Sequence, residues 1–147
     1  MTDRELRELC HRYFDAIERR DVDAVAELYA PGFTFWVNLT GAESSREENL
    51  KTLREGYAVL RRRSYDDRTI DTFGTGFLAR YSVNVVQHSG KRGSFSACVV
   101  AQCKDGKITH IDEYLDSSKF AGRARAAPSE AASGASRAQR AEGERSQ

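Results

Sequence analysis

Residues 94–115 read SFSACVVAQCKDGKITHIDEYL, two runs rich in β-branched and aromatic residues on either side of Asp105-Gly106. Aspartate followed by glycine favours a tight hairpin turn, and β-branched and aromatic side chains favour an extended chain. The stretch therefore predicts two antiparallel strands, one near 94–104 and one near 107–115.

The same period of two begins earlier, near Tyr65, and extends this pair into an antiparallel meander. Further runs of this kind lie near 66–73 and 76–88. Turn residues separate them, at Gly74 and at 89–93.

The N-terminal half instead shows the apolar spacing of helices. Apolar residues three and four positions apart predict an amphipathic helix over residues 3–20, whose apolar face includes Tyr13. Asp21 caps a second helix, which Pro31-Gly32 ends. An aromatic run from Phe33 to Val37 predicts a short strand after it.

A third helix is expected next, since Ser45 and Glu48 form a capping box. Arg61-Arg62-Arg63 would close this helix, where cations suit the carbonyl end of the helix dipole. Helices in the first half and strands in the second predict an α+β fold, in which three N-terminal helices cover one face of a curved antiparallel sheet. Such a sheet and its helices can enclose a pocket.

The composition predicts one folded domain and a tail. The chain has 147 residues, of which 39% are hydrophobic, enough for a single buried core. Residues 121–147 contain no aromatic residue and no Leu, Ile or Val, so we expect a disordered Ala/Ser/Arg-rich tail after a domain at 1–120.

Charge and hydropathy exclude several classes of protein. The net charge is +1, which gives no overall attraction to nucleic acid. No run approaches the ~18 apolar residues of a membrane span, and the N-terminus lacks the pattern of a signal peptide. We therefore expect a soluble, cytoplasmic protein that binds neither nucleic acid nor membrane.

Metal and cofactor motifs are missing from the sequence. Cys10, Cys98 and Cys103 lack the spacing of zinc ligands, and the chain has no phosphate-binding glycine loop and no dinucleotide fingerprint. We expect no metal and no cofactor, and we expect Cys98 and Cys103 to be core residues.

The last predicted strand carries the best candidate for proton transfer. Ile111, Glu113 and Leu115 share one of its faces, and His110 and Asp112 share the other. If the first face is the core, Glu113 is desolvated, its pKa rises, and it can act as a general acid or base near neutral pH. If the helices cover the other face, Glu113 is merely exposed. The strand by itself leaves both alternatives open.

Neutral polar residues elsewhere are candidates for substrate binding. Ser82 and Asn84 project to one face of a strand and suit hydrogen bonding to a ligand. The alternative is that Tyr81, Val83 and Val85 form the core face while Ser82 and Asn84 meet solvent.

Three further residues have both a structural and a ligand-binding interpretation. Trp36 is expected to be buried, and Asn38 beside it can line the mouth of a cavity. Tyr13 lies in an apolar helix face, so its hydroxyl needs a partner, which is either a backbone carbonyl or a ligand.

Several motifs stand in a characteristic order along residues 4–120. They are Arg12-Tyr13-Phe14, Arg20-Asp21-Val22-Asp23-Ala24, Leu28-Tyr29-Ala30-Pro31, Gly41, Asp105-Gly106-Lys107-Ile108 and Glu113-Tyr114-Leu115-Asp116. This order resembles the nuclear transport factor 2-like superfamily, which includes ketosteroid isomerases, limonene-1,2-epoxide hydrolases and SnoaL-like polyketide cyclases. The resemblance implies a cone-shaped curved sheet around a deep pocket that holds Glu113, and a homodimer formed through the sheet.

The catalytic residues of these enzymes carry over only in part. Both catalytic acids of the isomerases fall on residues that are not acids here. The Asp-Arg-Asp triad of the epoxide hydrolases falls on Ser82, Asn84 and Glu113, so one acid remains, as a glutamate. The catalytic Asp of the cyclases also aligns with Glu113.

The sequence therefore predicts a cofactor-independent acid/base enzyme that acts on an apolar small molecule bearing a carbonyl or an epoxide. Cyclisation, isomerisation, dehydration and epoxide hydrolysis all remain possible reactions. In this interpretation Glu113 moves the proton, and the substrate-binding residues are Tyr13, Trp36, Asn38, Ser82 and Asn84. The alternative is a non-catalytic module that binds a small ligand or a protein partner.

Overall fold

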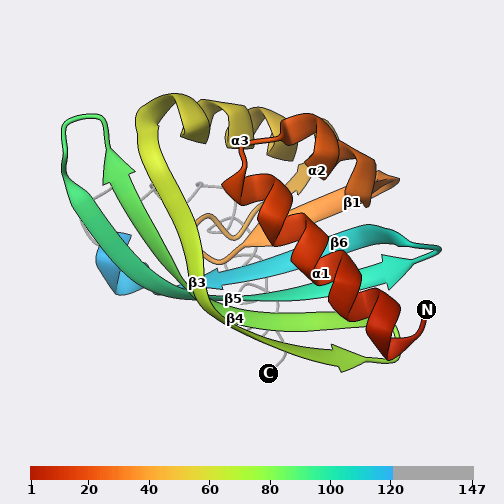
Figure 1. Cartoon of the computed structure of the whole chain (residues 1–147). Coiled ribbons are helices and arrows are strands. Elements are labelled where there is room, and N and C mark those ends of the chain that lie inside the picture. The colour runs from red at the N-terminus through yellow and green to blue at the C-terminus, as the bar shows by residue number, and fades with distance from the viewer. Residues whose placement is uncertain (121–147) are drawn as a thin grey trace, which may run out of the picture.

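The computed structural model describes residues 1–120, so the predicted tail at 121–147 lies outside the described residues. Within this range no helix combines the length and the apolar character needed to cross a bilayer. Figure 1 shows the elements in chain order. They are α1 (Asp3–Glu18), α2 (Val22–Leu28), β1 (Tyr29–Val37), β2 (Glu43–Ser45), α3 (Arg46–Val59), β3 (Leu60–Phe73), β4 (Gly76–Gln87), β5 (Arg92–Lys104), β6 (Lys107–Leu115) and the 3₁₀ helix η1 (Ser117–Phe120).

The strands form one curved sheet in the order β2-β1-β6-β5-β4-β3. Strands β3 to β6 are the expected antiparallel meander. Strand β1, however, pairs with β6 in parallel, so the sheet is mixed and not antiparallel throughout. The chain leaves β1, crosses through α3 to the far edge at β3, and returns through three hairpins, which brings β6 alongside β1 in the same direction.

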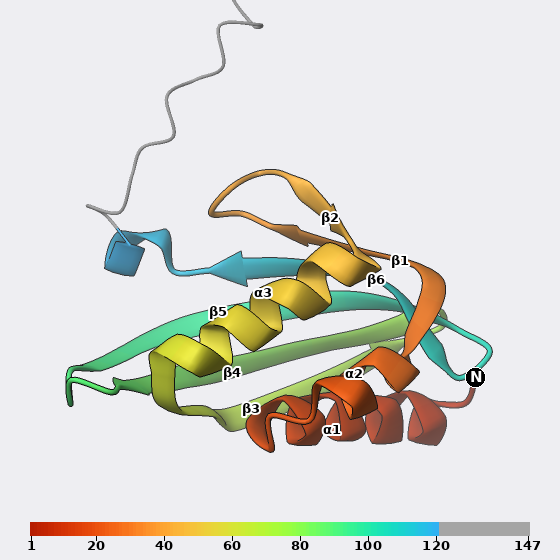
Figure 2. The same cartoon turned by 90° about the horizontal axis from the view of Figure 1, so that it is seen from above.

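The three helices cover one face of this sheet, as the sequence predicts (Figures 1 and 2). Helix α1 packs on β3 and β4, and α3 packs on β1 and β3. The residues that α1 buries follow its apolar stripe, with Phe14 fully enclosed against Tyr65 and Tyr81 of the sheet. Each fully buried aromatic or aliphatic side chain contributes about 1.5–3 kcal/mol to stability, so this shared core fixes the position of α1.

Two element boundaries differ from the sequence prediction. Helix α2 ends at Leu28, and Pro31-Gly32 lies inside β1, where a register shift between Tyr29 and Thr34 accommodates the two residues. Helix α3 ends at Val59, so the arginine run 61–63 belongs to the start of β3. The arginine side chains therefore alternate between the two faces of the sheet instead of closing a helix.

Candidate functional site

A cavity of about 270 Å³ lies between the helices and the inner face of the sheet. Its walls are mainly apolar. Its polar groups are two phenols, an amide, a hydroxyl, a guanidinium and a carboxyl, which come from four elements. The lining residues are Tyr13, Phe14 and Ile17 of α1, Phe35, Val37 and Leu39 of β1 and its loop, Asn49, Thr52, Leu53 and Gly56 of α3, Arg63 and Tyr65 of β3, and Val83, Phe95, Glu113 and Leu115 of the remaining strands.

Glu113 points into this cavity, so the inner face of β6 is the one that carries Ile111, Glu113 and Leu115. The Tyr81 hydroxyl donates a hydrogen bond of 2.8 Å to Glu113 Oε2. Desolvation raises the pKa of the Glu113 carboxyl, while the bond from Tyr81 and the charge of Arg63 act in the opposite direction. Glu113 is thus a stronger base than an exposed glutamate, held in a defined orientation.

Two tyrosine side chains line the same cavity, and the Tyr13 hydroxyl is hydrogen-bonded to Tyr29. Tyr13 of α1 and Tyr65 of β3 both line it, and burial raises the pKa of each phenol above its ordinary value. Both groups therefore remain neutral hydrogen-bond donors at physiological pH. A third phenol, Tyr29, is committed to the structure, because its hydroxyl donates to Asn49 Oδ1 at 2.9 Å.

Arg63 is a cavity residue that the sequence analysis missed. It lies two positions before Tyr65 on β3, so both side chains point to the inner face of the strand. The signal in the sequence is the spacing of two between Arg63 and Tyr65, which puts both side chains on one face if the arginine run belongs to a strand. The guanidinium brings a positive charge into a cavity whose negative group is Glu113.

Ser82 and Asn84 do not line this cavity. Tyr81 and Val83 are buried toward the helices, and the alternation of the strand therefore turns Ser82 and Asn84 to the outer face. Asn84 Nδ2 donates to Asp66 Oδ2 at 2.7 Å on that face. Both side chains thus lie on the face of the sheet opposite Glu113, as in the alternative in which Tyr81 and Val83 belong to the core face.

Trp36 and Asn38 are also placed outside the cavity lining. Trp36 lies on the outer face, where its ring packs against Tyr114 with centroids 5.2 Å apart. Asn38 uses both ends of its side-chain amide on the backbone of Leu115, donating at 3.0 Å and accepting at 2.9 Å. It therefore joins the ends of two neighbouring strands. Of the residues predicted for the site, the structure brings together Glu113 and Tyr13.

A hydrogen-bonded chain of side chains crosses from β1 to β6 on the outer face. Thr34 Oγ1 and His110 Nδ1 are 2.7 Å apart, and His110 Nε2 lies 3.0 Å from Asp112 Oδ1. These contacts tie the parallel strand pair together. In the described range, residues 1–120, no three His, Cys, Asp or Glu side chains converge as metal ligands would.

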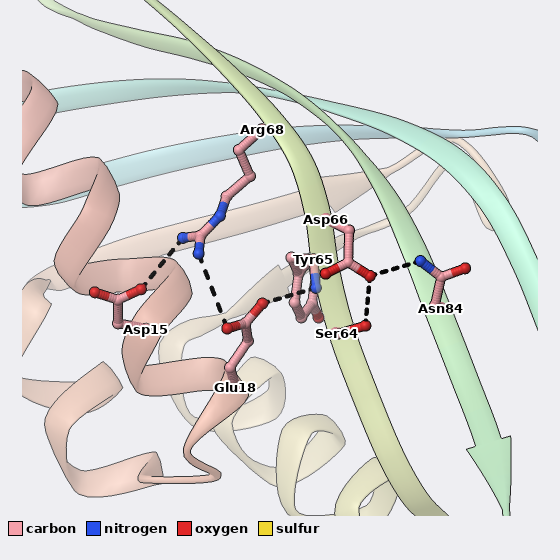
Figure 3. A network of polar contacts seen from close by, with 7 residues as sticks. All are labelled: Asp15, Glu18, Ser64, Tyr65, Asp66, Arg68 and Asn84. Carbon is pink, nitrogen blue, oxygen red and sulfur yellow. Dashed lines mark hydrogen bonds and ion pairs between the residues drawn. The ribbon is translucent and has the colours of Figure 1, made fainter.

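A polar network fixes the part of β3 that delivers Arg63 and Tyr65 (Figure 3). The register of β3 on β4 shifts between Asp66 and Thr69. Just before this bulge on the edge strand, the Tyr65 N–H donates to Glu18 Oε1 at 2.8 Å. Arg68 then reaches back to α1, with its guanidinium 3.3 Å from Asp15 and 3.9 Å from Glu18. The network positions the β3 side of the cavity against α1.

Comparison with known proteins identifies relatives of this fold. The model of a family described as SnoaL-like domain matches residues 10–111, more than half of the chain. No curated protein matches the chain in sequence.

Several solved structures are similar to the described fold. A proposed polyketide cyclase from Xanthomonas campestris is 21% identical over 80% of this chain and 95% of its own, with a TM-score of 0.74. A proposed SnoaL-like polyketide cyclase from Shewanella denitrificans is 10% identical over 82% and 96%, with a TM-score of 0.72. AclR from Streptomyces galilaeus, a proposed hydroxylase, is 16% identical over 78% and 80%, with a TM-score of 0.70. At these identities the likeness establishes the fold and leaves the chemistry to the side chains in the cavity.

Proposed function

Because the chain belongs to the SnoaL-like domain family, we propose that its cavity is the active site of a cofactor-independent acid/base enzyme acting on a small apolar ketone-like molecule. The observation that carries this proposal is Glu113, a carboxyl group of raised pKa that projects into an apolar cavity with one oxygen held by Tyr81. A general base needs this combination of access, orientation and base strength.

The proposed step is removal of a proton from a carbon next to the carbonyl group. The C–H bond breaks, the proton moves to a Glu113 oxygen, and the electron pair of that bond passes into the carbonyl group as an enolate. If the substrate has a C=C bond next to that carbon, the enolate is conjugated with it, and Glu113 can return the proton at the far carbon to give an isomer with a shifted double bond. If the enolate carbon attacks a second carbonyl group in the molecule, Glu113 gives its proton to the alkoxide that forms, and the product is a ring. Glu113 is regenerated in both reactions.

The surroundings of Glu113 support this chemistry. The neutral phenol of Tyr65 can donate a hydrogen bond to an oxygen that becomes negative during the step. Tyr13 can do the same by exchanging its hydrogen bond to Tyr29 for one to the substrate. Phe35, Leu53 and Phe95 supply apolar walls that exclude bulk water and strengthen these interactions. No step requires a metal or a redox cofactor.

The size of the cavity restricts the substrate. Its volume of about 270 Å³ is near the lower end of the roughly 300–1,000 Å³ usual for small-molecule sites. A molecule of one or two rings fits this space better than a four-ring steroid. The proposal therefore favours a compact aromatic or alicyclic ketone.

Deuterium exchange tests the proposed step without knowledge of the natural substrate. 2-Tetralone, a two-ring ketone with acidic C–H groups, is incubated with the protein in D₂O, and the loss of its α-proton signals is followed by ¹H NMR. We expect the native chain to accelerate the exchange and E113Q to lose about 10²–10⁴-fold of that acceleration. D112N is the matched control, because Asp112 is the neighbouring acid on the outer face, bonded to His110.

The outcome separates the enzyme from its alternative. Equal loss in E113Q and D112N, or full activity in E113Q, would contradict the role of Glu113. A native chain that binds 2-tetralone without accelerating exchange would favour the non-catalytic ligand-binding module. The proposal also includes a homodimer formed through the outer face of the sheet, as the resemblance implies, and a cytoplasmic location.

A further inference from the structure

Arg63 holds a hydrogen-bond donor that the fold leaves unused. Its Nε atom is buried and has no hydrogen-bond partner. Arg46 is the other described residue with a buried, unpartnered Nε, but its two terminal nitrogens are occupied by Glu47 and by the carbonyl of Ala26. Arg63 has a hydrogen bond to the neutral Tyr65 side chain, but no carboxylate or backbone carbonyl within residues 1–120 accepts from it, so its guanidinium is not held as that of Arg46 is.

The charge of Arg63 is also not neutralised at short range. Within residues 1–120 the arginines that form ion pairs are Arg7, Arg46 and Arg68, and Arg63 forms none. Glu113 lies on β6, and β4 and β5 separate that strand from β3, which carries Arg63. The two charged groups therefore interact electrostatically over a distance and are not in contact. A guanidinium partly withdrawn from water with no anion in contact is unfavourable, and a bound anion would relieve that cost.

Arg63 borders the cavity on the side next to α3. Arg63 lines the cavity together with Gly56, and a Cβ added to Gly56 would lie 3.9 Å from Arg63 Nη1. The absence of a side chain at this position of α3 therefore leaves room beside the guanidinium. Apolar surface from Leu53, Val83 and Phe95 continues from there.

We infer that Arg63 binds an anionic oxygen of the substrate, which makes the ligand of this cavity an acidic molecule, a one- or two-ring system bearing a carboxylate or an acidic enol. The inference rests on the proposed function for the reacting end of the cavity, at Glu113. The ring lies against Leu53, Val83 and Phe95, and the charged oxygen forms charge-assisted hydrogen bonds with the guanidinium, whose planar fork suits two-oxygen groups. Binding at Arg63 and proton transfer at Glu113 thus occupy different strands of one cavity.

Binding of matched probes tests this assignment. Isothermal titration calorimetry of the full chain compares naphthalene-2-carboxylate with the neutral naphthalene-2-carboxamide, and 2-hydroxy-1,4-naphthoquinone, an acidic enol, with its neutral 2-methoxy ether. We expect at least one of the two anions to bind about tenfold more tightly than its neutral partner. The pair that shows this preference tells a carboxylate ligand from an enol ligand.

Variants of the arginine run locate the effect. R63M should remove the preference for the anion, whereas R63K, which keeps the charge, should retain part of it. R62M is the matched control, because Arg62 is the exposed neighbour on the same strand and its loss changes the net charge by the same amount. R63M should also keep the native affinity for the neutral probes, which shows that its loss of the preference is not a consequence of misfolding.

Three results would overturn the inference. They are an R63M protein that keeps the preference, an equal loss in R62M and R63M, and a native chain that binds neither anion more tightly than its neutral partner at millimolar concentration. Failure of the proposed function is a separate result, because E113Q is expected to keep the preference for the anion. An E113Q protein with full exchange activity would refute the role of Glu113 without affecting the assignment of Arg63.

Discussion

At the scale of one residue, the buried carboxyl of Glu113 opposes the stability of the fold. Its carboxyl lies between the apolar side chains Ile111 and Leu115 and faces an apolar cavity. Desolvation disfavours its charged form in the folded protein, and one hydrogen bond from Tyr81 offsets this only in part. An amide of the same shape would avoid the cost of burying a charge, so the carboxyl is better explained by chemistry than by packing.

The pH dependence of stability tests this argument. Because folding raises the pKa of Glu113 above its ordinary value of 4.5, the folded protein binds more protons than the unfolded chain between these two values. The contribution of Glu113 to stability therefore falls as pH rises from 4.5 through the raised pKa, and is constant at higher pH. We expect the unfolding free energy of the native chain, relative to that of E113Q, to decrease over this interval in urea titrations at a series of pH values.

The comparison with E113Q removes the contributions of the other titrating groups, which both proteins share. A difference between the two proteins that does not change with pH would show that Glu113 is well solvated in the fold. A difference that increases with pH would show that its pKa is lowered by folding.

At the scale of elements, the cavity depends on the contact between α1 and the bulge in β3. Tyr65 lies just before the bulge, and because β3 is the edge strand of the sheet, its backbone N–H is not used by a neighbouring strand. Glu18 of α1 accepts that N–H, and Arg68 holds Glu18 and Asp15 while its guanidinium lies 5.5 Å from the centre of the Phe14 ring. The irregular strand and the helix thus stabilise each other.

Removal of Arg68 tests the strength of this contact. R68M keeps much of the apolar stem and loses both carboxylate partners, so we expect it to lower the unfolding free energy by about 1–3 kcal/mol in urea titrations. K51M is the control, because it breaks the exposed Lys51–Glu55 pair, which should cost less than about 0.5 kcal/mol. Equal effects of the two substitutions would mean that the network of Figure 3 is an ordinary surface feature.

The elements also show why the sequence predicts the fold better than the site. The helical stripe of α1, the capping box at Ser45 and the turn at Asp105-Gly106 are local signals, and the structure contains each of them. The inner face of β6 is not a local property, since Glu113 interrupts an apolar pattern, and the resemblance was needed to favour it. Arg63 was missed because three arginines after a helical stretch also satisfy the rule for a helix end.

At the scale of the whole molecule, the pairing of β1 with β6 could not be read from the sequence for the same reason. The two strands are far apart along the chain, and their parallel direction follows from the path through α3 to the opposite edge of the sheet. One result of this topology is a sheet whose inner face is covered by helices and whose outer face is uncovered in the single chain. The outer face carries an open hollow of about 570 Å³, lined by both polar and apolar surface.

The proposed homodimer would cover this outer face, and Tyr114 is the residue on which it should depend. Tyr114 borders the hollow, packs on Trp36, and is 48% exposed in the single chain, which is unusual for a large aromatic side chain. We expect sedimentation equilibrium to give twice the chain mass of 16.5 kDa for the native protein and a single chain mass for Y114E. A glutamate at this position would place a negative charge beside Asp116 in the centre of the interface, where an unpaired charge is costly.

F73E is the control, since Phe73 is also an exposed aromatic but ends β3 at the edge of the sheet, and the F73E protein should remain dimeric. A native chain that sediments as a monomer, or a Y114E protein that stays dimeric, would contradict a dimer formed through this face.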